Sequence, residues 1–433
     1  MGHNRGKLLL KPTQDSDQMA DSASNSMQWV SALSTRPSLE AAVNEVVTSA
    51  QAALAAPADL GLVFISSTFA SEYPRLLPLL NERLNVPALI GCGGGGIIGN
   101  AAAEPDAVLE MEDEPALVLC LAHLPGVSVQ PFWLDEDKLP DLDSSPESWT
   151  QYVGVDPQDN PDFILIADPF TSKITDLLQG MDFAYPTACK IGGMASGGTA
   201  ERANGLFFNQ QYYEEGTIGV ALSGRISICP VVSQGCRPVG PVFRVVEGQR
   251  NVILKLETDA GQAADASPLE ALQKLLRDLT ESEREIAQRA LFVGVAYSGF
   301  PDSLEQGDFL IRSLVGIDPR AGAIAIGDRV RPGQRIQFHL RDADTAAEDL
   351  ERLLKRHCEQ MDEEQPPVGG LMFSCLGRGE DLYNEQNFDS GLLRKYIRTL
   401  PLSGFFCDGE IGPIGGSTYL HGYTSVFGLI YEE

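Results

Sequence analysis

The pattern of apolar positions predicts alternating helices and strands from the beginning of the folded sequence. Between residues 38 and 54 the apolar positions fall on one helical face, and Pro37 suits the first turn of that helix. A continuous apolar run at residues 60–66 then predicts a strand. A helix from Tyr73 to Leu84 and a second strand in "PALIGC" are expected to follow.

The same order of elements occurs two more times along the chain. One copy runs through "DFILIADPF", a short helix around Ile174–Leu178, and "PTACKIGGMASGG". Another runs through the helix "DTAAEDLERLLKRH", with Thr345 and Glu348 as a capping box, the strand "GGLMFSC", a helix in "SGLLRKYIRTL" and the strand "PLSGFFC". Each copy has an apolar strand that ends near a cysteine and continues into glycines. These cysteines are Cys92, Cys189 and Cys407.

Three segments are predicted. Residues 1–26 are polar and aperiodic, which indicates a disordered tail, and the rest divides into residues 27–260 and 261–433. Ser267, Pro268 and Glu270 form a well-made helix start just after this boundary. The later strands suggest antiparallel pairs with short turns. The predicted class is mixed α/β (α+β): two related domains with mixed β-sheets flanked by helices and internal strand–helix–strand–glycine-loop repeats.

Charge and composition exclude several classes of function. The 433 residues carry a formal charge of −28, which repels nucleic acids and anionic membrane surfaces. The longest uncharged stretch, residues 84–103, contains Pro87 and several glycines, so no membrane insertion is expected. The eight cysteines form no C-x-x-C pair, which argues against a zinc site and a disulfide framework. We therefore expect reduced thiols in the cytoplasm.

The glycine run at residues 91–96 matches G-x-G-x-x-G, but a nucleotide site needs a long helix after it, and Pro105 follows too soon. No Lys-Ser or Lys-Thr follows the glycines either, so no nucleotide cofactor is expected. Glycine backbones can instead point N–H groups at a carboxylate. The alternative is that the loops are only tight turns between strands. The ligand-binding candidates in these loops are Gly91, Cys92, Gly93, Cys189, Gly192, Gly193, Cys407 and Gly409.

Further candidates carry charge or a thiol. In "VVSQGCRPVG", which includes Gly235, Arg237 could lower the pKa of the Cys236 thiol, although a lone cysteine is more often a small core residue. Arg312 lies inside an apolar strand and Arg378 follows another; either guanidinium could bind a ligand carboxylate or form an internal salt bridge. The last candidates are Cys375, Glu410 in the final glycine loop and His421. No catalytic or metal-binding motif occurs.

Several of these segments together resemble the FIST family, named for F-box and intracellular signal transduction proteins, with N-terminal and C-terminal FIST domains. The matching segments are "VSALSTRPSLEAAV", "GLVFIS", "ALIGCGGGGIIG", "VVSQGCRPVG", the stretch from "GDFLIRSLVGID" to "DADTAAEDL", "SCLGRGEDLY" and "LSGFFCDGEIGPIGGSTYLHGYTSV". The resemblance implies a sensory module that binds small ligands such as amino acids and is often attached to signalling output domains or an F-box.

The chain departs from the family pattern in two respects. Where the family often has a "GCSTAGEI"-like loop, this chain has "GCGGGGIIG", so only the C-terminal copy keeps an acidic residue, Glu410. The flanking segments leave no room for an output domain, so signalling is expected to need a separate partner protein. The expected function is sensing of an amino acid or another carboxylate metabolite in an interdomain cleft. The alternatives are an enzyme that uses Cys236 or Cys407 in that cleft and an interaction scaffold without a ligand.

Overall fold

The computed structural model describes residues 26–258, 267–297, 304, 307–362 and 364–433. The predicted tail lies outside these residues apart from Ser26, and so does the predicted boundary at residue 260. Within the described residues, no helix is long and apolar enough to cross a membrane.

One mixed sheet of twelve strands forms the centre of the molecule. In spatial order, eleven strands run β11-β10-β3-β2-β6-β1-β4-β21-β20-β24-β13, and β5 pairs with β4. The strands are β1 (Gln28–Ser34), β2 (Leu60–Ser66), β3 (Ala88–Gly94), β4 (Gly96–Ala101), β5 (Glu104–Glu112), β6 (Leu117–His123), β10 (Leu206–Phe208), β11 (Gln211–Tyr213), β13 (Ile226–Ser233), β20 (Gly369–Cys375), β21 (Leu402–Cys407) and β24 (Ser425–Glu432). The pairing of β4 with β21 joins strands from the N-terminal and C-terminal parts of the chain in one sheet.

A second sheet has the order β23-β22-β9-β8-β12-β7. Its strands are β7 (Val127–Leu134), β8 (Asp162–Ala167), β9 (Lys190–Met194), β12 (Thr217–Gly224), β22 (Glu410–Ile414) and β23 (Ser417–His421). Apolar side chains from both sheets, such as Phe64 and Ile166, share one buried core, so the sheets pack face to face.

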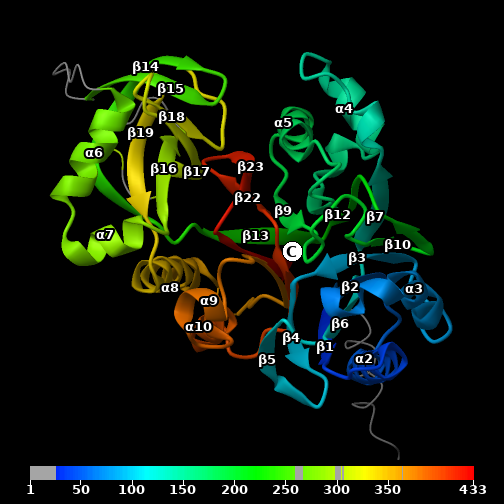
Figure 1. The fold of residues 1–433 in the computed structure, drawn as a ribbon. Helices are drawn as coiled ribbons and strands as arrows, with labels where there is room; N and C mark the ends of the chain where they lie inside the picture. The colour runs from blue at the N-terminus through cyan, green and yellow to red at the C-terminus, as the bar shows by residue number, and fades with distance from the viewer. Residues whose placement is uncertain (1–25, 259–266, 298–303, 305–306, 363) are drawn as a thin grey trace, which may run out of the picture.

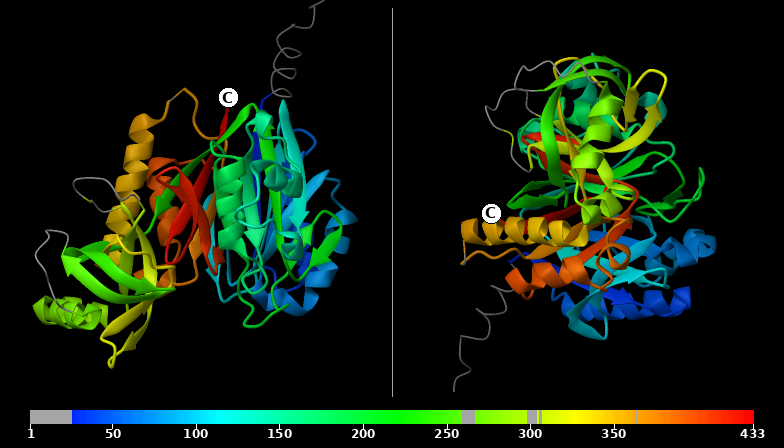
Figure 2. Two further views of the ribbon diagram at one scale, coloured as in Figure 1. Left: turned by 90° about the horizontal axis from the view of Figure 1, so that it is seen from above. Right: turned by 60° about the vertical axis from the view of Figure 1, so that its left-hand side comes forward.

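Helices cover the outer face of each sheet, which gives four layers (Figures 1 and 2). Those on the twelve-stranded sheet are α2 (Leu39–Ala53), α3 (Tyr73–Asn81), α8 (Ala343–Gln360), α9 (Glu380–Tyr383) and α10 (Phe388–Tyr396); those on the smaller sheet are α4 (Pro146–Val153) and α5 (Ile174–Ala184). Short 3₁₀ turns lie at Ser67–Glu72, Glu136–Lys138 and Pro157–Asp159. Because β2 is covered on both faces, all of its residues are buried, which explains its continuous apolar run.

A closed barrel lies to one side of the layers (Figure 1). Its strands are β14 (Arg237–Gln249), β15 (Val252–Thr258), β16 (Leu291–Ala296), β17 (Phe309–Asp318), β18 (Ala323–Ile326) and β19 (Arg335–Leu340), and α6 (Pro268–Asp278) and α7 (Glu281–Ala287) lie beside it. The barrel therefore combines strands from both sides of residue 260, a pairing that the sequence did not reveal.

The predicted mixed α/β class and the repeats are confirmed. The parallel pairs β2–β3, β8–β9 and β20–β21 each span one predicted strand–helix–strand unit. The capping box of Ser267 and Glu270 is also confirmed. The capping box of Thr345 and Glu348 was wrong: α8 begins earlier, because the Asp342 side chain caps it by accepting from the Thr345 N–H at 2.8 Å.

Candidate functional site

The three glycine-rich strands use their glycines for close packing. In each repeat one glycine of the second strand faces a carbonyl of the first, so that an added Cβ would lie 1.8 Å from the carbonyl oxygen. These pairs are Gly91 with Val63, Gly192 with Leu165 and Gly404 with Met372. No side chain fits there, so these glycines are required by the parallel strand pairing.

The ends of these strands also bond to one another. Gly193 lies opposite Glu410 in the pairing of β9 with β22, and a Cβ on Gly193 would lie 2.2 Å from the Cys407 Sγ. The Gly409 carbonyl accepts from the Met194 N–H at 2.8 Å, and the Gly93 carbonyl accepts from the Ser196 N–H at 3.2 Å. These backbone groups hydrogen-bond to one another rather than pointing at a ligand. This favours the alternative in which the glycine loops serve packing.

Two of the three repeat cysteines come together. Cys92 and Cys407 lie in the core between the sheets, whereas Cys189 precedes β9, at the opposite end of that strand from Gly193. The Cys189 N–H donates to Asp162 Oδ1 at 2.7 Å. Burial raises the pKa of all eight thiols, so none is held as a thiolate by its surroundings.

Arg237 does not activate Cys236 as suggested. Its guanidinium forms ion pairs with Glu283 at 3.1 Å and Asp342 at 3.6 Å. Burial raises the Cys236 pKa to about 12, while Arg341 and Arg378 lower it to a lesser degree. The cations that act on this thiol are therefore two arginines from later in the chain.

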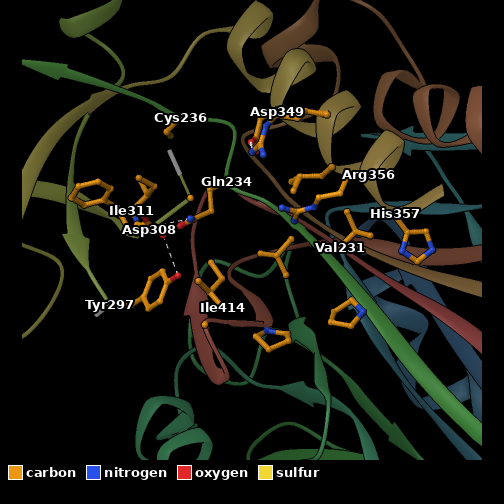
Figure 3. Close-up of a pocket in the computed structure, with 18 of the residues that line it drawn as sticks. Val231, Gln234, Cys236, Tyr297, Asp308, Ile311, Asp349, Arg356, His357 and Ile414 are labelled. Carbon is orange, nitrogen blue, oxygen red and sulfur yellow. Dashed lines mark hydrogen bonds and ion pairs between the residues drawn. The ribbon is translucent and has the colours of Figure 1, made fainter. Parts of the chain in front are cut away.

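A cleft of about 460 Å³ separates the barrel from the layered part of the molecule (Figure 3). Gln234 lies at its upper side, where its Nε2 donates to the Phe309 carbonyl at 2.7 Å and its Oε1 accepts from the Ile311 N–H at 3.1 Å. These bonds fix the end of β13 to barrel strand β17. Cys236 also lines the cleft.

Helix α8 supplies basic side chains to the cleft. Arg356 extends from α8 toward the centre of the view in Figure 3, and among the described residues it forms no hydrogen bond or ion pair. Arg352 binds Asp349 at 2.8 Å, and Asp349 also accepts from the Ser233 hydroxyl at 2.8 Å. Arg356 therefore contributes a positive charge that this part of the protein does not neutralise.

The cleft also contains a thiol–imidazole contact that involves neither Cys236 nor Cys407. The Cys229 Sγ lies 3.7 Å from His357 Nδ1, and His357 Nε2 lies 2.7 Å from the Tyr431 hydroxyl. Burial raises the Cys229 pKa and lowers the His357 pKa, so both groups are neutral near neutral pH. The geometry of a nucleophile and base is present, but the environment opposes formation of the ion pair.

Arg312 and His421 meet in a second pocket of about 480 Å³ between α5, β17 and β23. Arg312 Nε donates to Asp328 Oδ2 at 2.7 Å, and its Nη1 donates to the Leu420 carbonyl at 3.1 Å. Burial lowers the His421 pKa to about 4, and its Nε2 bonds to the Gly412 carbonyl at 2.9 Å. Arg312 thus forms the internal salt bridge that was the alternative to a ligand.

Arg378 lies in a fully buried ion pair. Its Nε donates to Asp389 Oδ2 at 2.7 Å and its Nη2 to Asp389 Oδ1 at 3.0 Å, while the Tyr383 hydroxyl lies 2.6 Å from Nη2. Its Nη1 is buried without a hydrogen-bond partner among the described residues. A Cβ on Gly235, whose φ is +61°, would lie 2.9 Å from that Nη1.

Glu410 and Cys375 lie beside this pair. Burial raises the Glu410 pKa to about 8, while the Thr424 N–H, 3.0 Å from Oε2, and the nearby Arg378 and Arg341 lower it to a lesser degree. The Cys375 Sγ accepts from the Gly377 N–H at 3.5 Å. We call Arg341, Arg378, Glu410, Ser374 and Ser425 the buried polar cluster.

Comparison with known proteins places the chain in a family. The model of the FIST N domain matches residues 59–259, and that of the FIST C domain matches residues 268–413. The chain belongs to the FIST family. FIST domains are sensory domains of signal transduction, so the resemblance seen in the sequence is confirmed at this level.

Relatives of this FIST protein include bacterial and eukaryotic chains. The Mycobacterium tuberculosis protein Rv0628c is 32% identical over 402 residues, covering 92% of this chain and 98% of its own length. F-box only protein 22 of Homo sapiens is 32% identical over 78 residues, 14% of this chain and 19% of its own. A solved cyanuric acid hydrolase from A. caulinodans covers 93% of this chain and 99% of its own at 11% identity, but its TM-score of 0.31 supports no argument.

Two arginines of this FIST protein were missed by the sequence reasoning. Arg341 lies between barrel strand β19 and α8, and Arg356 lies on the cleft side of α8. Arg341 directly precedes Asp342, the N-cap of α8, and the sequence at this position does not indicate which residues its side chain contacts. For Arg356 a signal existed, because it lies in the basic run "LLKRH" of a strongly acidic chain.

No described group of three or more His, Cys, Asp or Glu side chains could hold a metal ion. The described cysteines are all free thiols.

Proposed function

We propose that this FIST protein senses a small carboxylate-bearing metabolite, such as an amino acid or organic acid, in the cleft of Figure 3 and signals through a separate partner protein. The observation that carries the proposal is the guanidinium of Arg356, which extends into the cleft without a partner among the described residues. A guanidinium presents two parallel N–H groups that match the two oxygens of a carboxylate.

The rest of the cleft supports a ligand with more than one polar group. The Tyr297 hydroxyl binds Asp308 Oδ1 at 3.2 Å on the barrel side, opposite Arg356 and His357 on α8. An amino acid would place its carboxylate near Arg356 and its ammonium near the carboxylates of Asp308 or Asp349. In a chain of net charge −28, the unneutralised Arg356 on the cleft wall is a local exception that favours an anionic group.

The position of the cleft suggests how binding would be transmitted. Its walls come from the barrel on one side and from α8 and β13 on the other. A ligand that contacts both walls would therefore favour the arrangement of barrel and layers in which both contacts form. A partner protein that recognises the bridged arrangement would then respond to the ligand. Eight free thiols fit a reducing compartment, and we place this activity in the cytoplasm.

The test is a panel of amino acids and organic acids, measured by thermal shift and then by calorimetry, with mass spectrometry of molecules that co-purify. Arg356→Gln is expected to weaken binding of any hit by about tenfold or more, because a hydrogen bond to a charged group contributes about 1.5–3 kcal/mol. Lys355→Gln is the matched control, since Lys355 is exposed on the same helix but does not line the cleft. Equal loss in both variants, or no hit in a broad panel, would contradict the proposal.

A further inference from the structure

The buried polar cluster lies behind the cleft wall and is separate from the Arg356 site. Arg341 and Arg378 approach it from different elements: Arg341 from the β19–α8 connection, and Arg378 from the loop after β20. Both guanidinium groups act on the same two acids, the Cys236 thiol and the Glu410 carboxyl. Gly235 separates Arg378 from the cleft residues Gln234 and Cys236.

The two arginines differ in how their charge is neutralised. Arg378 has Asp389 as a two-bond partner, with only Nη1 left over. Arg341 stacks on Tyr423, with its Cζ 4.3 Å from the ring centroid, and among the described residues it has no carboxylate partner. Its Nε and Nη1 are buried without hydrogen-bond partners in that same part of the chain. With Glu410 protonated, as its raised pKa favours, the cluster and Asp389 together hold one positive charge in excess, and three N–H-bearing nitrogens are unused.

Serine hydroxyls extend this set of donors. Ser233, Ser425 and Ser374 lie opposite one another on β13, β24 and β20, so their side chains share one face of the sheet. Ser233 donates to Asp349, but the hydroxyls of Ser425 and Ser374 have no partner among the described residues. Glu410 Oε1 is likewise buried without a hydrogen-bond partner by distance and angle among the described residues, and the Cys375 thiol interacts with this carboxyl. Buried polar groups are normally satisfied, and one unpaired group costs about 1–3 kcal/mol.

We propose that the buried polar cluster binds a compact monovalent oxyanion of the carboxylate type between Arg341 and Arg378. One negative charge would neutralise Arg341, and the two oxygens of a carboxylate match the Nε–Nη2 edge of a guanidinium, the edge that Asp389 occupies on Arg378. Arg378 Nη1 and the serine hydroxyls supply the remaining donors. Because burial raises the Glu410 pKa to about 8, this carboxyl is mostly protonated near neutrality and can donate rather than repel.

The backbone around Arg341 supports a built site. Tyr423, which lies under the guanidinium, has φ +62°, a left-handed conformation that is unfavourable for a bulky residue and concentrates at functional sites. Gly377 lies against this pair: a Cβ there would lie 3.5 Å from Arg341 Nη2 and 3.4 Å from the Tyr423 ring. Arg341 is half-buried, so an ion can reach the cluster from its side.

The experiment uses the full chain in thermal-shift and calorimetric titrations with sodium acetate, compared with sodium chloride and sodium sulfate at equal ionic strength. We expect acetate to raise Tm in a saturable way beyond chloride and sulfate, because a ligand that binds only the folded state stabilises it. Arg341→Gln is expected to raise the acetate Kd by about tenfold or more. The exposed Arg398→Gln is the control and is expected to leave the Kd unchanged.

Two further variants keep the test decisive. If Arg341→Gln does not fold, Gly377→Ala adds one methyl group at ordinary contact distance, and it is expected to fold and to weaken acetate binding. Arg356→Gln is expected to lose the metabolite of the cleft while keeping the acetate response, which separates this site from the proposed function. Equal effects of acetate and chloride, or an unchanged acetate Kd in both Arg341→Gln and Gly377→Ala, would overturn the proposal.

Discussion

The glycine strand ends and the buried polar cluster lie near each other but use their polar groups in opposite ways. Around Gly91 and Gly192 the neighbouring strand approaches so closely that no side chain fits, and the glycine loops bond to one another. In the polar cluster, whose member Glu410 directly follows Gly409, guanidinium, hydroxyl and carboxyl groups are buried without partners among the described residues. The glycine-rich motif, which attracts attention in the sequence, serves packing, whereas the proposed ligand sites lie where charged groups lack partners among the described residues.

The largest expected effect comes from breaking the buried ion pair between Arg378 and Asp389. Asp389→Ala leaves the Arg378 guanidinium buried without its carboxylate, and we expect a loss of about 3–5 kcal/mol in the free energy of unfolding. Urea denaturation measures this loss. Glu72→Ala removes a partly exposed partner of Arg75 and is expected to cost much less, because solvent screens this pair. Similar losses in the two variants would contradict the prediction, because they would mean that a buried and an exposed ion pair contribute equally to stability.

A somewhat smaller effect is expected at the glycine strands. Gly91→Ala places a methyl group 1.8 Å from the Val63 carbonyl oxygen, so the parallel strands must separate, at a cost of about 3 kcal/mol. Gly391→Ala is the matched control, because its Cβ meets nothing within 4 Å and alanine favours the helix α10. Urea denaturation of both variants decides the matter, and a neutral Gly91→Ala would refute the packing role.

The last prediction concerns the pH dependence of stability. Burial raises the pKa of Glu410 from 4.5 to about 8, so the folded protein keeps a proton that the unfolded chain releases. The contribution of Glu410 to stability is therefore fully present below about pH 4.5 and is lost as pH rises through about 8. Glu410→Gln is expected to flatten this part of the decline.

The measurement is the urea midpoint of wild type and Glu410→Gln between about pH 5 and about pH 8. Glu110 adds a decline of the same sign in the wild type and in the variant, because burial and the nearby Asp389 raise its pKa to about 7. The exposed Glu348→Gln is the control. A slope that Glu410→Gln leaves unchanged would show that Glu410 is not protonated in the folded state.

Much of the local structure could be predicted. The strand at residues 60–66 and the helix near residues 38–54 follow from the spacing of apolar residues, and both have nearly the expected bounds. The helix after Tyr73 ends at Asn81, three residues before the expected Leu84, because helix ends depend on contacts as well as on periodicity. The division of the chain at residue 260 stays a prediction.

The candidate site was only partly predictable. Arg378 and Glu410 were recognised as unusual charges in glycine-rich loops, and both lie in the buried polar cluster. Cys236 lines the cleft of Figure 3, and the cations that act on its thiol are Arg341 and Arg378 rather than Arg237. Contacts of a side chain with residues a hundred positions away leave no periodic trace in the sequence.

The sequence by itself determined the three strand–helix–strand repeats and the FIST resemblance, because spacing, caps and glycines act within a few residues of one another. Only the tertiary structure decided that β4 pairs with β21, that the barrel combines β14 and β15 with later strands, and that Arg341 lies over Tyr423 and Arg356 lines the cleft. Strand partners are selected by burial of whole faces, and that selection depends on all of the strands together.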